Sequence, residues 1–249
     1  MSIDGEEDIE ALRKIGRIVA QTLRLMRERA LPGMTTKALD EIGRTFLRES
    51  GAQSAPELFY QFPGATCISV GEEMAHGIPG DRVLIAGDLV NVDVSAELAG
   101  YVADTGGSFV VGAESDSQRE LLEATRLALT AGMQAAKAGV RVNEIGRAIE
   151  AVADRFAYTV IRNLGSHGVG RSLHEEPEFI AGYYNAKDKR KLKAGQVITI
   201  EPFISTGALW ADDKGDGWTL LTNPKYRTAQ FEHTIVITAG APLVMTYPD

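Results

Sequence analysis

The order of predicted helices and strands occurs twice along the chain, and this repeat is the strongest constraint on its fold. In the first half, apolar residues recur at helical spacing over residues 6–30, and the pattern stops at Leu31-Pro32-Gly33. A second helix is expected over residues 36–51, and strand-like runs follow over residues 59–112. The first half is therefore predicted to be a helix pair followed by strands.

The second half repeats this order. Ser117-Gln118-Arg119-Glu120 has the form of a capping box and predicts a helix that runs to about Lys137. Asn143 is expected to cap another helix, and strands resume near residue 159. The tetrapeptide EIGR, at 41–44 and again at 144–147, is a faint echo of the repeat. We expect one α/β (α+β) domain over residues 1–249, with two pseudo-symmetric halves.

The composition predicts a soluble, cytoplasmic, globular protein. With 249 residues, 44% hydrophobic and 24% charged, the chain is long enough for a sizeable core. We find no signal-peptide pattern and no apolar run long enough to span a bilayer. The net charge of −8 argues against DNA or an anionic membrane as a partner. The single cysteine, Cys67, excludes a disulfide framework and a zinc site built from cysteines.

Two aspartates interrupt a predicted strand pair over residues 90–105. Val90, Val92 and Val94 alternate with polar residues, which places Asp93 on the polar face of its strand. If the chain reverses near Leu98 and Ala99, a regular antiparallel register places Asp104 opposite Asp93. Like charges that face each other in a sheet repel unless a cation lies between them. The pair therefore predicts a bound cation.

Further candidate ligands occur in the second half of the chain. They are His167 and His174 in GSHGVGRSLHEEP, Glu201 at the end of an alternating strand, and Glu232, which we place inside another strand. Taken singly, such residues usually face water or form structural hydrogen bonds. Together with Asp93 and Asp104, however, the glutamates make four carboxylates in apolar strands, and their burial without counter-charge is costly. Two divalent cations would balance them, and an imidazole ligand would suit Mn, Fe, Co or Zn.

Six segments in the same order resemble the type I methionine aminopeptidases of metallopeptidase family M24. These segments are EEMAHGIPGD, VNVDV, YVADT, GSHGVGRSLHEEP, ITIEPF and QFEHTIVIT. The resemblance covers nearly the whole chain and implies the pita-bread fold, in which both halves form one curved sheet. It also implies a dinuclear metal site. In that site Asp93 chelates one ion, Asp104 and Glu232 bridge both ions, and His167 and Glu201 complete the two sides.

The same resemblance implies the activity and its remaining residues. The enzyme would remove an N-terminal methionine when the second residue is small, with Glu201, His76 and His174 as catalytic residues. The two histidines would also contact the substrate, and Phe59, Phe62, Cys67 and Trp218 would line the methionine pocket. The expected partners are nascent polypeptides and peptides that begin with methionine. We expect a monomer and consider the ribosome a candidate docking partner, although the loop WADDKGDGW is acidic where bacterial relatives tend to be basic.

Three other classes remain as alternatives. An Xaa-Pro aminopeptidase or prolidase would share the fold and ligands, but such enzymes carry a separate N-terminal domain for which the residues before Cys67 leave no room. A non-catalytic binding relative should have lost ligands, and none is lost here. A two-metal phosphoesterase uses similar ligands, yet no glycine-rich or arginine-containing phosphate cradle adjoins these motifs. The sequence also departs from the pattern of the methionine aminopeptidases at residue 71, which is glycine where that family usually has asparagine.

Overall fold

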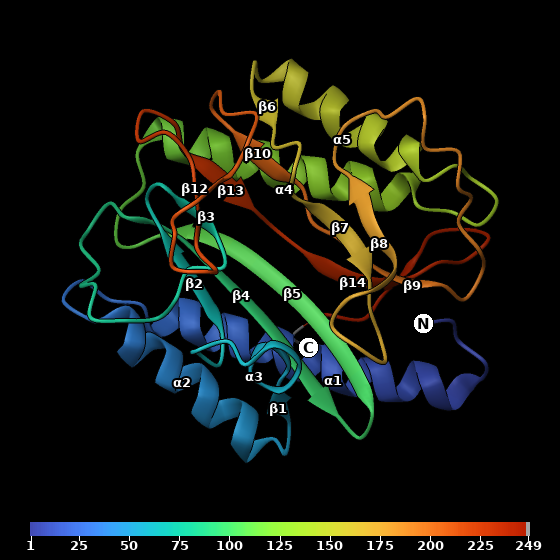
Figure 1. The fold of residues 1–249 in the computed structure, drawn as a ribbon, viewed down its shortest axis with the longest axis horizontal. Coiled ribbons are helices and arrows are strands. Elements are labelled where there is room, and N and C mark those ends of the chain that lie inside the picture. The colour runs from blue at the N-terminus through green and yellow to red at the C-terminus, as the bar shows by residue number, and fades with distance from the viewer. Residues whose placement is uncertain (248–249) are drawn as a thin grey trace.

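The computed structural model describes residues 1–247, and its two halves each begin with a helix pair (Figure 1). The first half contains α1 (Glu6–Arg29), α2 (Thr36–Glu49), β1 (Gln53–Ser54), α3 (Ala55–Tyr60), β2 (Cys67–Val70), β3 (Glu73–Ala75), β4 (Leu89–Leu98) and β5 (Tyr101–Val110). The second half begins with α4 (Asp116–Ala135) and α5 (Asn143–Arg155). Its strands are β6 (Thr159–Val160), β7 (Gly165–Gly168), β8 (Glu175–Ala181), β9 (Val197–Ile200), β10 (Phe203–Ser205), β11 (Asp212–Asp213), β12 (Leu220–Leu221), β13 (Thr228–Gln230), β14 (His233–Val236) and β15 (Leu243–Val244).

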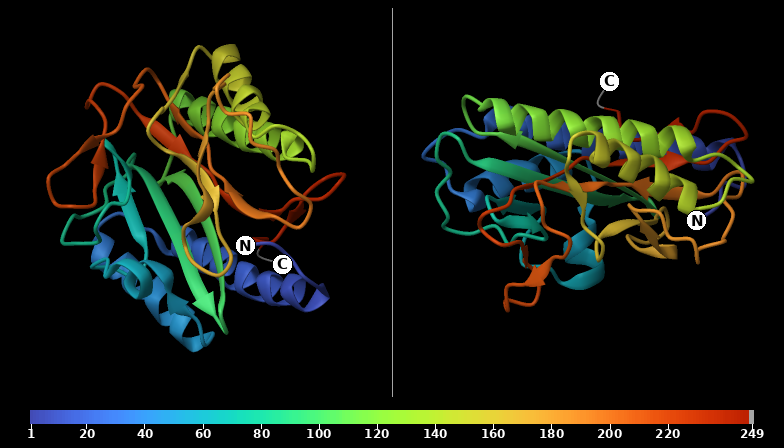
Figure 2. Two further views of the ribbon diagram at one scale, coloured as in Figure 1. Left: turned by 45° about the vertical axis from the view of Figure 1, so that its right-hand side comes forward. Right: turned by 90° about the horizontal axis from the view of Figure 1, so that it is seen from above.

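Antiparallel strands from the two halves meet in the middle of the molecule. In the first half β4 pairs with β1, β2 and β5, and in the second half the order β15-β14-β9-β7-β8 forms a five-stranded sheet. A bridge between Gly107 and Phe231 joins β5 to the segment that precedes β14. Two smaller sheets, β13-β10-β6 and β11-β12-β3, complete the described strands. Figure 2 shows α1 and α4 along one side of this strand layer.

Each half has its own apolar core beneath its helix pair. In the first half, Ile15, Val19 and Leu39 from the helices pack against Val90 and Val92 of β4. In the second half, the apolar faces of α4 and α5 pack against strand residues such as Ile198, Ile200 and Ile235. Burial of these faces, rather than helix propensity alone, holds the helices on the strands. Within residues 1–247, no helix has the length and apolar character required to cross a bilayer.

The predicted register of the aspartate hairpin is wrong by two residues. Asp93 pairs with Gly106 and Asp104 pairs with Ser95, because Ala99 and Gly100 form the two-residue turn. Both turn residues have positive φ, 53° and 82°, as a tight hairpin turn of this kind requires. A shift of two residues leaves every side chain on its original face, so Asp93 and Asp104 still lie diagonally on one surface.

Four other local predictions need correction. The N-cap of α4 is Ser115, whose hydroxyl oxygen accepts from the Gln118 amide in a capping box, so the box begins two residues before Ser117. Asn143 is the first residue of α5 and not its cap; its side-chain amide donates to the Asn185 carbonyl. The short helix α3 lies where no helix was predicted. Glu232 lies between β13 and β14, not within a strand.

Candidate metal centre

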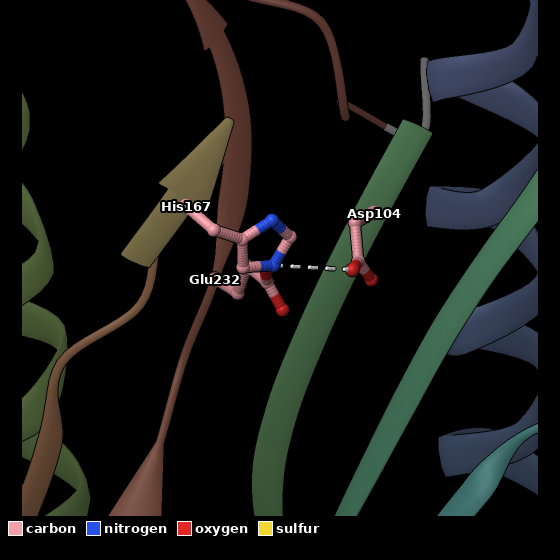
Figure 3. A group of neighbouring side chains, drawn as sticks. All are labelled: Asp104, His167 and Glu232. Carbon is pink, nitrogen blue, oxygen red and sulfur yellow. Dashed lines mark ion pairs between the residues drawn. The ribbon is translucent and has the colours of Figure 1, made fainter. Parts of the chain in front are cut away.

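Three buried side chains from distant parts of the chain converge at the centre of the strand layer (Figure 3). Asp104 comes from β5, His167 from β7, and Glu232 from the link between β13 and β14. One potential ligand atom of each lies within 4.8 Å of the others. The His167 Nε2 atom lies 3.8 Å from Asp104 Oδ2. The three atoms are therefore close enough together to surround one cation.

The other two predicted ligands lie beside this group. His167 Nε2 is 3.3 Å from Glu201 Oε1, and the Asp93 side chain lies beside that of Asp104. The structure therefore brings all five residues together, and their role as metal ligands remains a prediction. Asp93, Asp104, His167 and Glu201 line a cavity of about 370 Å³, which we call the central cavity.

Backbone contacts between the halves hold Asp104 and Glu232 in place. The Thr234 hydroxyl accepts from the Asp104 amide at 2.9 Å and donates to the Asp104 carbonyl at 2.8 Å. The Glu232 amide donates to the Gly106 carbonyl at 2.9 Å, and the Thr105 hydroxyl donates to the Glu232 carbonyl at 2.8 Å. The centre is therefore assembled only when the two halves are joined.

Neutral side chains orient the two glutamates. Gln230 Nε2 donates to Glu232 Oε2 at 3.0 Å, and the Thr199 hydroxyl donates to Glu201 Oε1 at 3.0 Å. Thr199 also accepts from the His167 backbone amide at 3.1 Å, which couples β7 to β9. No functional role was predicted from the sequence for Gln230 or Thr199. Their positions two residues before a glutamate, on the same face of an extended segment, are the signal that could have found them.

The carboxylates in this group destabilise one another's charged forms. Burial raises the pKa of Asp93 to about 6. Burial, and then the negative charges of Glu232 and Asp93, hold the pKa of Asp104 well above its usual range. The pKa values of Glu201 and Glu232 are raised in the same way, by burial first and by neighbouring carboxylates second. Such a group favours a bound cation over the charged, empty state.

The residues present fit a divalent cation. Asp104 Oδ1 and Glu232 Oε1 are buried, and neither has a hydrogen-bond partner in the described part of the chain. Burial lowers the pKa of His167 to about 3, so its imidazole is neutral and its Nε2 can offer a lone pair. Carboxylate oxygens with one imidazole nitrogen suit first-row divalent ions. A cation here would give both orphaned oxygens a partner.

Aromatic side chains form the apolar wall of the central cavity. Phe62 and Trp218 line it and meet edge to face, with ring centroids 5.2 Å apart. Cys67 also lines it and pairs with Asp93 across β2 and β4, so the apolar wall adjoins the carboxylates. Burial raises the pKa of the Cys67 thiol well above its usual range. This cysteine is a neutral wall residue at pH 7.

Phe59 does not line this cavity, which corrects the expectation for that residue. Its neighbour Tyr60 lines the cavity instead, while Phe59 is 37% exposed. Consecutive residues on a helix point about 100° apart, so Phe59 and Tyr60 at the end of α3 cannot both face the centre. The sequence does carry a signal for α3, which was overlooked: Ser54 caps the helix and Pro56 lies in its first turn.

The two predicted catalytic histidines, His76 and His174, line the cavity near His167. The His174 ring is 4.2 Å from the His167 ring, and its Nδ1 is 2.8 Å from the Tyr60 hydroxyl. His76 follows β3 with a positive φ of 53°, and burial, assisted by the nearby His174, lowers its pKa to about 4. Both rings are therefore neutral at pH 7 and can donate or accept hydrogen bonds.

Known proteins resemble this chain over nearly its whole length. Residues 10–239 match the model of metallopeptidase family M24. The methionine aminopeptidase 2 of Bacillus subtilis is 50% identical over 247 residues, which cover 99% of each chain. A methionine aminopeptidase of Staphylococcus epidermidis is 46% identical over the full length of both chains. The crystal structure of methionine aminopeptidase from Rickettsia prowazekii superposes with a TM-score of 0.94 at 34% identity and covers 99% of this chain and 100% of that chain. The fold, the buried carboxylate–imidazole group and these matches together place the chain in metallopeptidase family M24.

Proposed function

We propose that this protein is a methionine aminopeptidase, which hydrolyses the first peptide bond of chains that begin with methionine and have a small second residue. The observation that carries the proposal is the position of the metal centre. Asp93, Asp104, His167 and Glu201 lie at one cavity whose apolar wall contains Phe62, Cys67 and Trp218. The full-length similarity to methionine aminopeptidases supports the same activity.

The proposed cofactor is a pair of divalent cations held by Asp93, Asp104, His167, Glu201 and Glu232. Such ions lower the pKa of water to about 7 and polarise a carbonyl group. The candidate ions are Mn, Fe, Co and Zn. Exhaustive chelation should abolish peptide hydrolysis, and added Mn, Fe or Co should restore it. Undiminished turnover by protein shown to be free of metal would contradict this assignment.

The chain's own residues provide the proton transfers and orientation. Glu201, held by Thr199, accepts the proton of the attacking water and passes it to the leaving amine. His174 and His76 donate hydrogen bonds to the developing oxyanion and to the scissile amide. A free N-terminal amine has a pKa of about 8 and is largely cationic at pH 7. Once deprotonated, this amine would offer a lone pair to a bound cation, whereas an internal peptide nitrogen offers none, which would restrict cleavage to the N-terminus.

The cavity wall explains the preference for methionine. Aromatic faces and a neutral sulfur suit a long, unbranched thioether through dispersion and sulfur–aromatic contacts. A bulky second residue would have to displace packed walls, which makes exclusion by size steep. We expect Met-Ala, Met-Gly and Met-Ser termini to be cleaved, and Met-Leu or Met-Lys termini to resist.

The decisive test is a set of Met-X-Ser peptides with metal-loaded protein. Release of methionine should be at least tenfold faster for X = Ala than for X = Leu, and Ala-Pro peptides and a phosphate ester should be poor substrates. Glu201→Gln is the inactive control, because it keeps the size of the side chain and removes the proton acceptor, which is also a predicted metal ligand. Comparable kcat/KM for X = Ala and X = Leu, or faster release of Pro-linked residues, would contradict the proposal.

We further propose the setting in which the enzyme acts. Residues 1–249 would form a single catalytic domain that works as a cytoplasmic monomer on nascent polypeptides. The absence of a membrane-spanning helix in residues 1–247 is compatible with this setting. Sedimentation of the purified protein alone and with ribosomes tests the monomer and the proposed docking in one experiment.

A further inference from the structure

A second cavity lies across the strand layer from the central cavity. It has a volume of about 470 Å³ and lies between α1 and α4, which run along the same side of the strands (Figure 2). Thr105 lines it, whereas its neighbour Asp104 lines the central cavity. Successive side chains of a strand point to opposite faces, so the two cavities are separated by β5. We call this second cavity the α1–α4 hollow.

Three arginines surround the hollow. Arg24 and Arg27 are one turn apart on α1, and Arg126 faces them from α4. In residues 1–247 none of the three forms an ion pair with a carboxylate. The Arg126 guanidinium lies 4.5 Å from the centre of the Phe231 ring. This concentration of positive charge occurs in a chain whose net charge is −8.

Arg27 and Arg126 repel each other across the hollow. The pKa of Arg126 is lowered, first by burial and then by the positive charge of Arg27. Glu114 and Glu123 act in the opposite direction but less strongly, and neither reaches ion-pair distance of Arg126. Glu232 also lines the hollow, but in residues 1–247 it forms no ion pair with the exposed Arg27 or Arg126. An anion between them would relieve the repulsion.

Apart from the arginines, the lining has an apolar part and a polar part, and the polar residues are Thr105, Ser108, Thr130, Glu232, His233, Thr246 and Tyr247. Leu23 projects from α1, Leu129 and Met133 lie one and two turns beyond Arg126 on α4, and Phe231 forms part of the floor. Gly106 and Gly107 of β5 also line the hollow, and their lack of side chains leaves its floor open. The volume lies within the range of small-molecule sites, which combine apolar walls with a few placed polar groups. A simple inorganic anion would use the arginines but leave these walls unoccupied.

We propose that the α1–α4 hollow binds a nucleoside polyphosphate, with the phosphates on Arg24, Arg27 and Arg126 and the base against Leu129, Met133 and Phe231. Guanidinium groups match phosphate oxygens with paired hydrogen bonds, and several phosphates can meet three arginines at once. The base is flat and apolar on its faces, so it would pack against the apolar part of the wall. Glu232, a predicted metal ligand, also lines the hollow, so the two sites adjoin at this residue. The proposed nucleotide binding does not depend on the activity proposed at the metal centre.

The test measures binding of ATP, tripolyphosphate and adenosine to the metal-loaded protein by calorimetry at low ionic strength. ATP should bind most tightly, tripolyphosphate more weakly, and adenosine without measurable affinity. Arg126→Ala should weaken ATP binding about tenfold, as expected when a charged hydrogen-bond donor is lost. Arg29→Ala is the matched control, because Arg29 is an exposed arginine at the end of α1 that does not line the hollow. It should change the affinity less than twofold.

Three outcomes would overturn the proposal. The first is an absence of ATP binding at millimolar concentration. The second is equal weakening by Arg126→Ala and Arg29→Ala, which indicates diffuse attraction to positive charge. The third is ATP binding that survives Arg27→Ala/Arg126→Ala but is lost in Asp104→Asn, which places the nucleotide at the metal centre. Since all these variants of α1 and α4 lie outside the central cavity, hydrolysis of Met-Ala-Ser by them reports the proposed function separately.

Discussion

Gln230 holds one oxygen of Glu232 and leaves the other free. Its Nε2 donates to Glu232 Oε2 at 3.0 Å, while Glu232 Oε1 has no hydrogen-bond partner in the described chain. Asn91 Nδ2 donates to Gln230 Oε1 at 2.8 Å, which fixes the direction of the glutamine amide. The three side chains are buried. Gln230 therefore turns the free oxygen of Glu232 toward the metal centre.

Replacement of Gln230 by leucine tests this orientation. Gln230→Leu removes the donor with little change in size, so Glu232 loses its fixed rotamer. Loss of a group that orients a ligand typically weakens metal affinity about 10- to 100-fold. Metal titration by calorimetry measures the change, and Gln134→Leu on the exposed face of α4 is the control. Unchanged metal affinity in folded Gln230→Leu protein would show that Gln230 serves packing alone.

Asp104→Asn should separate metal binding from intrinsic stability. In the metal-free protein, Asp104 is buried beside Glu232 and Asp93, whose charges raise its pKa. The amide removes that repulsion, so the metal-free variant should unfold at the same temperature as the parent or higher. A ligand that binds only the folded state raises the melting temperature, and this increase should be lost in the variant.

Thermal unfolding with and without Mn measures both effects. Asp116→Asn, an exposed carboxylate on the first turn of α4, should keep the full increase. An Asp104→Asn protein that is stabilised by Mn as strongly as the parent would show that Asp104 is not a ligand.

Tyr60 should act on catalysis through His174. Its hydroxyl lies 2.8 Å from His174 Nδ1, so Tyr60→Phe frees that ring without changing the cavity wall. Since a single hydrogen bond contributes about 0.5–1.5 kcal/mol, kcat should fall about 2- to 10-fold. His174→Ala and His76→Ala should lower kcat roughly 10²-fold to 10³-fold while the metal content stays unchanged.

A double variant tests whether the two residues act together. If Tyr60 works by holding His174, Tyr60→Phe should have no further effect in the His174→Ala background. Tyr184→Phe, at an exposed ring beneath Arg147, is the control. Additive losses in the double variant, or loss of metal from either histidine variant, would contradict these roles.

The sequence predicted structure best where a single physical requirement, such as burial of one helix face, determines a local pattern of residues. Helical spacing of apolar residues placed α1 and α2 within two residues of their observed ends, because burial of one face determines it. Carboxylates in predicted apolar strands pointed to Asp104 and Glu232, since buried charge needs a partner, and the structure places His167 of the GSHGVG segment beside them. The hairpin register was wrong because Ala99, unlike Gly100, carries no sign of its positive φ.

Other features depend on contacts between segments far apart in the chain. Phe59 and Tyr60 are both aromatic and adjacent, and only the axis of α3 decides which one meets His174. The support of Glu232 by Gln230 and Asn91 joins residues 139 positions apart. Such pairings are set by how the two halves pack. The pattern of a single segment does not contain them.

The repeated EIGR tetrapeptide places a buried helical glycine in each half, and the two glycines should differ in their tolerance of a methyl group. A Cβ on Gly146 of α5 would lie 2.1 Å from the Tyr183 carbonyl oxygen and 2.5 Å from that of Ala181. A Cβ on Gly43 of α2 would lie 2.6 Å from the sulfur of Met26, the flexible end of a side chain. Backbone atoms cannot move aside without shifting the sheet, whereas Met26 can change rotamer.

Gly146→Ala should therefore lower the free energy of unfolding by about 2–3 kcal/mol, the cost of forcing a methyl group into a packed site. In Gly43→Ala the smaller rearrangement of Met26 is offset by alanine's helix propensity, which exceeds that of glycine by about 1 kcal/mol, so stability should change by less than about 1 kcal/mol. Urea unfolding of the metal-free proteins measures both values, and an equal m-value confirms that the comparison is valid. Equal destabilisation by the two changes, or a stable Gly146→Ala protein, would mean that α5 can move away from the strand that carries Ala181.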